Sequence, residues 1–111
     1  MSQGLFVAQR LSALVLGPLV LVHLGLIMVA IRGGLSAEEI LGRTQGSIGW
    51  ALFYGAFVVA AAVHAPIGLR NILREWTRLR PRAVDLISLG FGAFLLVAGL
   101  RAVVAVIGGP A

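Results

Sequence analysis

Three long apolar runs dominate this chain of 111 residues. They cover residues 11–31, 48–69 and 86–107. Each has about the 20 residues that an α-helix needs to cross a hydrocarbon core of about 30 Å. Since backbone polar groups cannot be left unpaired in lipid, each run should be a transmembrane helix. We therefore predict an all-α integral membrane protein with a single transmembrane domain over residues 1–111.

The composition excludes several classes of protein. Apolar residues make up 59% of the chain and charged residues 12%, whereas a soluble domain has about a quarter charged residues. A soluble enzyme is therefore excluded. The net charge of +5 comes from arginines that punctuate the apolar runs, so no nucleic-acid partner is expected. The chain has no cysteine, which excludes thiolate catalysis and cysteine-bound metal clusters.

The two segments that connect the apolar runs differ in charge. Residues 33–47 form a short polar loop, in which Ser36 followed by Glu39 resembles a capping box that opens a brief helix. Residues 70–85 are basic, and we expect a helical extension of the second span at the interface, which Pro81 stops. The arginines of this segment are Arg70, Arg74, Arg78, Arg80 and Arg82.

The arginines also predict how the chain is oriented. Arg10 and the five arginines of residues 70–85 fall on one side of the membrane, and Arg32 and Arg43 fall on the other. By the positive-inside rule the N-terminus is cytoplasmic and the C-terminus lies outside. We expect a multi-pass protein of the bacterial inner (cytoplasmic) membrane.

Two histidines, His23 and His64, lie inside the first and second spans. An ionisable residue inside a span is costly and suggests a function, although a neutral imidazole that bonds to a neighbouring helix is an open alternative. No acidic residue shares these depths, which disfavours a proton relay. Haem iron is the usual partner of imidazole nitrogens in a helical bundle, so haem ligation is the favoured role.

The two histidines differ in depth. If Arg10 and Arg70 mark one interface, His23 lies 13 residues in and His64 six. The difference of seven residues corresponds to about 10 Å, and helix tilt compensates for only a few ångströms. We therefore predict that the two histidines do not share an iron, and that the chain is half of a haem-binding bundle.

Small residues surround His64, namely Ala60, Ala61, Ala62, Ala65 and Gly68. They could let a flat macrocycle or another helix approach the backbone closely, and both interpretations stay open. Pro66 predicts a bend beside the histidine. For Gly90, Gly92 and Gly99 of the third run we favour ordinary helix packing.

Two motifs resemble a known family. Residues 64–70, His-Ala-Pro-Ile-Gly-Leu-Arg, match the H-x-x-x-G-[IL]-R pattern of the cytochrome b membrane-anchor subunit of succinate dehydrogenase, in the succinate:quinone oxidoreductase and fumarate reductase family. Residues 9–12, Gln-Arg-Leu-Ser, resemble the H-R-x-S-G pattern at the start of its first helix. The chain departs from the family pattern at Phe6, Gln9 and Asn71.

The resemblance implies roles for five residues. His64 corresponds to an axial ligand of haem b, whose other ligand comes from a second anchor subunit. Arg10 corresponds to an arginine beside the quinone and the haem propionates. Arg70 is a candidate for a propionate contact or an interfacial anchor, and Ser12 is a second quinone candidate. His23 resembles the ligand of a second haem in two-haem members.

The resemblance also implies a function and partners. The chain would be a haem b-binding anchor, with one or two haems, that helps to bind quinone as substrate and passes electrons to it from a docked iron–sulfur subunit. A flavoprotein subunit would oxidise succinate, so this chain would do no succinate chemistry itself. The alternatives are a cofactor-free membrane scaffold and a small transporter. The transporter is disfavoured because a fourth span and an acid in the first helix are missing.

Overall fold

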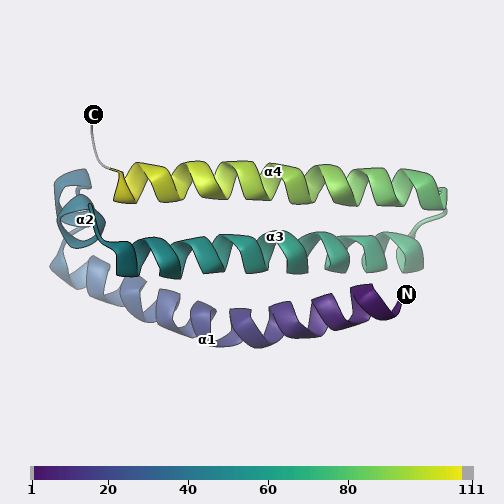
Figure 1. Ribbon diagram of the computed structural model, residues 1–111, viewed down its shortest axis with the longest axis horizontal. Coiled ribbons are helices and arrows are strands. Elements are labelled where there is room, and N and C mark those ends of the chain that lie inside the picture. The colour runs from purple at the N-terminus through teal and green to yellow at the C-terminus, as the bar shows by residue number, and fades with distance from the viewer. Residues whose placement is uncertain (1, 109–111) are drawn as a thin grey trace.

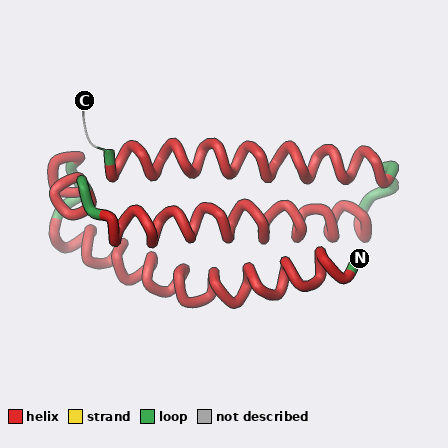
Figure 2. Tube along the Cα trace, in the orientation of Figure 1, coloured by secondary structure: helices red, strands yellow, loops and turns green. Residues whose placement is uncertain are grey.

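Three long helices lie side by side, with a short helix at one end (Figure 1). The computed structural model describes residues 2–108. The long helices are α1 (Gln3–Gly33), α3 (Ile48–Trp76) and α4 (Pro81–Ile107), and the short one is α2 (Ala37–Thr44). Figure 2 shows that only brief loops join them. All three long helices are long and apolar enough to cross a membrane, which confirms the predicted all-α membrane fold.

The helices extend beyond the predicted spans because local signals set their ends. Helix α1 begins at Gln3, where the Ser2 side chain accepts a hydrogen bond from the Leu5 amide at 3.2 Å. Helix α3 continues to Trp76, so the helical extension of the second span is confirmed. Pro81 then opens α4 at its first position, where a missing N–H costs nothing.

Helix α2 closes one end of the bundle. Ser36 Oγ accepts from the Glu39 amide at 3.2 Å, which confirms the predicted serine cap, whereas the Glu39 carboxylate bonds to the Ser36 hydroxyl at 2.8 Å and not to the Ser36 amide of a full capping box. Thr44 Oγ1 donates to the Val106 carbonyl at 2.7 Å, and the Gly46 amide donates to the Ile107 carbonyl at 2.8 Å. These bonds satisfy carbonyls that the last turn of α4 would otherwise leave open.

Helix α3 is the central helix and packs against both α1 and α4. A Cβ atom added to Gly99 would lie 2.5 Å from Val58 Cγ1, and one added to Gly92 would lie 2.9 Å from Pro66 Cγ. These two glycines therefore serve close helix packing, as predicted, whereas Gly90 faces open space. Helix α3 runs through Pro66 as one continuous helix, and the curvature visible in Figure 1 lies in α1, which contains Pro18.

Few side chains are buried within this one chain. The buried apolar residues are Ala60, Ile67 and Val84, and many large apolar side chains of the long helices are exposed. The molecule is 47 Å long, enough to span a hydrocarbon core of about 30 Å with both interfaces. Its outer faces therefore suit lipid or other membrane helices better than water.

Candidate cofactor-binding site

His64 lies where α3 contacts the first half of α1. Its Nδ1 atom is 3.4 Å from the hydroxyl oxygen of Ser12. Ser12 is only 7% exposed, and its hydroxyl also donates to the Gln9 carbonyl at 3.0 Å. The contact joins residues 52 positions apart in the sequence, and thereby sets the register of α1 against α3.

The two contacts of Ser12 favour one tautomer of His64. A serine hydroxyl has one proton and two lone pairs. With that proton directed at the Gln9 carbonyl, the shorter contact at 3.0 Å, the oxygen accepts from a protonated Nδ1 of His64 at 3.4 Å. The lone pair of Nε2 is left free, and no hydrogen bond of residues 2–108 uses this atom. An imidazole held in this way is oriented as a metal ligand.

His23 occupies a separate site in the other half of the bundle. Its ring centroid lies 5.1 Å from that of Phe57 and 6.3 Å from that of Tyr54, both in edge-on geometry. With these residues and the face of α4 around Gly99, it lines a pocket of about 370 Å³. The pocket is apolar and reaches all three long helices.

The depth difference between the histidines is larger than the sequence predicts. Ser12 is level with His64, and His23 follows Ser12 by 11 residues on α1, which corresponds to about 16 Å at 1.5 Å per residue. The expected 10 Å assumed that Arg10 and Arg70 are level. The register instead brings Arg70, six residues beyond His64, level with the region of Phe6. The geometry favours separate roles for the two histidines.

Arg10 lies away from the contact between Ser12 and His64. Its guanidinium carbon is 5.5 Å from the centroid of the Phe6 ring, one turn earlier on α1, and the side chain is exposed. Residues two positions apart on a helix point to different faces. The two quinone candidates Arg10 and Ser12 are therefore not brought together by this chain alone.

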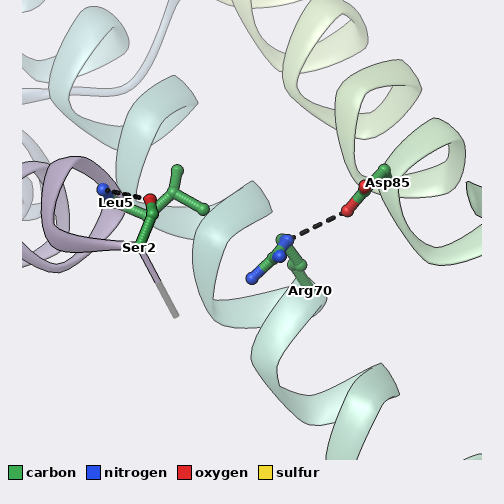
Figure 3. Close-up of polar contacts among 4 residues, drawn as sticks. All are labelled: Ser2, Leu5, Arg70 and Asp85. Carbon is green, nitrogen blue, oxygen red and sulfur yellow. Dashed lines mark hydrogen bonds and ion pairs between the residues drawn. The ribbon is translucent and has the colours of Figure 1, made fainter. Parts of the chain in front are cut away.

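Arg70 is paired with Asp85, a residue that the sequence analysis missed. Arg70 Nε donates to Asp85 Oδ1 at 3.0 Å and links α3 to α4 (Figure 3). The short loop between these helices was a signal for the pair, because it puts their adjoining ends side by side. The pairing favours an anchoring role for Arg70.

The small residues beside His64 contribute mainly to helix packing. The Ala62 carbonyl lies against Gly92 of α4, and Gly68 lies beside the Gln9 side chain of α1. Ala60 is buried. These contacts support helix packing at Ala60, Ala62 and Gly68.

The fold defines a class of protein: a multi-pass helical membrane protein with two well-separated histidines inside its spans. Residues 2–108 contain no cluster of three or more metal-ligating side chains. In a comparison with sequence models of protein families, the family of the succinate dehydrogenase/fumarate reductase transmembrane subunit matches residues 2–106. The chain belongs to this family, as its two motifs predict. It is therefore a membrane subunit of a complex with other succinate dehydrogenase or fumarate reductase subunits.

Comparison of the sequence with curated proteins gave no match, and comparison with solved structures gave none either.

Proposed function

We propose that this chain is a haem b-binding membrane anchor of a succinate:quinone oxidoreductase. In this role it helps to bind quinone and to pass electrons from a docked iron–sulfur subunit to the quinone. The observation that carries the proposal is the contact between the buried Ser12 hydroxyl and Nδ1 of the half-buried His64, which leaves Nε2 of the imidazole free. Membership of the family supports the rest.

His64 would hold the haem iron through Nε2, and a histidine of a second anchor subunit would supply the other axial ligand. The haem, when bound, accepts and releases one electron at a time. Ser12 keeps the His64 ring in one orientation and one tautomer. The apolar helices keep water from the site. The flavoprotein subunit oxidises succinate, and this chain takes no part in that reaction.

Arg10 is the quinone candidate of this chain. Its exposed guanidinium can donate to a quinone carbonyl or a haem propionate that lies between this chain and its partners. The Ser12 hydroxyl is already engaged by Gln9 and His64, which favours a positioning role over quinone binding. Arg70 is engaged by Asp85 and serves mainly as a link between α3 and α4.

His23 is the candidate ligand for a second haem. It lies in an apolar pocket about 16 Å from the level of His64, a depth at which a second macrocycle would not overlap the first. A structural histidine is the competing interpretation. Its edge-on contacts with Tyr54 and Phe57 suit either role.

The spectrum and haem content of the purified complex test both histidines. We expect His64→Ala to remove the half of the haem that this histidine holds, and with it about half of the b-type band in the reduced-minus-oxidised visible spectrum. We expect His23→Ala to remove half of the haem and to leave the remaining band intact. An unchanged spectrum in His64→Ala would reject the haem proposal in favour of a cofactor-free scaffold. Full haem content in His23→Ala would make that histidine structural.

A further inference from the structure

A second, unrelated feature is an apolar groove on the opposite face of α3. The groove has a volume of about 760 Å³ and is bordered by α1, α3 and α4. Val63 lines the groove, and Tyr54 lines the pocket of His23. These residues are nine positions apart, about two and a half helical turns, so they lie on opposite sides of α3. The groove is therefore separate from the pocket of His23.

One end of the groove is polar, and two of its hydrogen-bonding groups are unsatisfied. Arg70, Asp85 and Ser88 line this end. Arg70 uses Nε for Asp85, but its buried Nη1 has no hydrogen-bond partner among residues 2–108. Ser88 is 5% exposed, and its buried hydroxyl also lacks a partner there. Buried donors of this kind require an acceptor, and the groove is where an acceptor can enter.

The depth of the groove matches one leaflet of a bilayer. It extends from Arg70 to Val59 along α3 and from Asp85 to Leu96 along α4, and the two ends are 11 positions apart in each case. Eleven residues correspond to about 16 Å, half of a hydrocarbon core of about 30 Å. A single acyl chain fits the observed depth.

The charge around the polar end indicates an anionic headgroup. Residues 71–85 contain four more arginines and two acidic residues, Glu75 and Asp85. Asp85 itself faces the groove, but its charge is balanced by Arg70. Clusters of arginine at an interface attract anionic lipids. The further arginines are Arg74, Arg78, Arg80 and Arg82.

We propose that this groove binds one anionic phospholipid. Its phosphate accepts hydrogen bonds from Arg70 Nη1 and Ser88 Oγ, and one acyl chain lies along α3 and α4 as far as Leu96. The Arg70–Asp85 pair holds the guanidinium in position at the mouth of the groove (Figure 3). The proposal does not depend on haem or quinone binding.

Native mass spectrometry of the full chain, purified with the subunits that stay bound to it, tests the proposal. The protein is reconstituted in nanodiscs of phosphatidylcholine with a minority of phosphatidylglycerol, and the lipids retained after transfer to detergent are counted. We expect one phosphatidylglycerol per chain. Arg70→Gln should weaken its retention about tenfold, as expected for a lost charge-assisted hydrogen bond. Arg74→Gln removes the same charge outside the groove and should retain the lipid.

Two further variants keep the test independent of folding. Asp85→Asn keeps a side-chain oxygen that can accept from Arg70 Nε and so hold the guanidinium, while it removes a negative charge, so phosphatidylglycerol should be retained. Ala93→Phe fills the apolar part of the groove without touching the pair, so the lipid should be lost. Equal losses in Arg70→Gln and Arg74→Gln, or equal retention of phosphatidylcholine, would overturn the proposal. Loss of a bound subunit instead of a lipid in Ala93→Phe would identify the groove as a protein interface and reject the lipid.

Discussion

At the scale of single residues, Ser12 has the most specific position in the molecule. It is small enough to be buried between α1 and α3, and its hydroxyl bonds to Gln9 and to His64 at once. The sequence analysis singled out Ser12 as a quinone candidate and His64 as a ligand, but it did not connect them. Their contact depends on the register between α1 and α3. The sequence does not determine this register for two residues that are 52 positions apart.

Replacing Ser12 tests whether this hydrogen bond orients the His64 ring for binding to haem iron. In Ser12→Ala the imidazole can rotate and exchange tautomers, so we expect haem affinity to fall about 10- to 100-fold, the usual cost of losing a partner of a ligating histidine. Ser12→Thr keeps the hydroxyl and should retain most of the affinity. Haem titration of the membrane complex measures both. Equal affinities in Ser12→Ala and the unchanged protein would contradict the role given to Ser12.

Replacing Arg10 tests the quinone role. Arg10→Ala removes an exposed guanidinium that lies over the Phe6 ring. We expect kcat/KM for quinone reduction to fall about tenfold, the cost of one lost hydrogen bond to a charged donor. Succinate oxidation with a soluble artificial acceptor should be unchanged. Arg32→Ala, at the other end of α1, is the matched control. If both activities fall together in Arg10→Ala, the arginine is structural.

At the scale of helices, the length of the apolar runs was sufficient to find the three spans, because the bilayer dictates the length of an apolar helix. The predicted ends at residues 48 and 107 are those observed. The other ends were predicted too short, since helices continue through the interface until a cap or a proline intervenes. Ser2 and Pro81 supply those signals, and hydropathy does not register either of them.

The packing of α3 against α4 can be tested at Gly99. A side chain there would meet Val58, whose Cγ1 lies 2.5 Å from the site of an added Cβ. We expect Gly99→Val to lower the free energy of unfolding in detergent by about 1–3 kcal/mol, the cost of overpacking. Gly90→Val, which adds the same side chain in open space, should have a much smaller effect. Val58→Ala should partly rescue Gly99→Val. Equal losses at positions 90 and 99 would argue against close packing as the cause.

At the scale of the whole molecule, the chain is an open layer of helices with different chemistry on its two faces. One side of α3 carries the pocket of His23, and the opposite side carries the groove of Arg70, Asp85 and Ser88. The extensive exposed apolar surface of the long helices leaves room for partner helices and lipid. Under the proposed function, such a subunit would contribute one histidine to each haem and share each site with another chain.

The orientation of the layer can be tested directly because the chain has no cysteine. We predict a cytoplasmic N-terminus from the arginine distribution. A cysteine introduced as Glu38→Cys, in α2, should then react with a membrane-impermeant maleimide added to intact cells or spheroplasts. One introduced as Thr77→Cys, between α3 and α4, should react only after the membrane is opened. The reverse pattern would mean that the N-terminus lies outside.

The sequence by itself determined the class of the protein. Three apolar runs impose three spans, the two motifs identify the family, and two histidines stand out because ionisable residues are costly in lipid. Only the tertiary structure decided which residues meet: Ser12 with His64, Arg70 with Asp85, and His23 with Tyr54 and Phe57. The reason is physical. Hydropathy reports how deep each segment lies, whereas the register between helices depends on short-range contacts at positions such as Gly92 and Gly99.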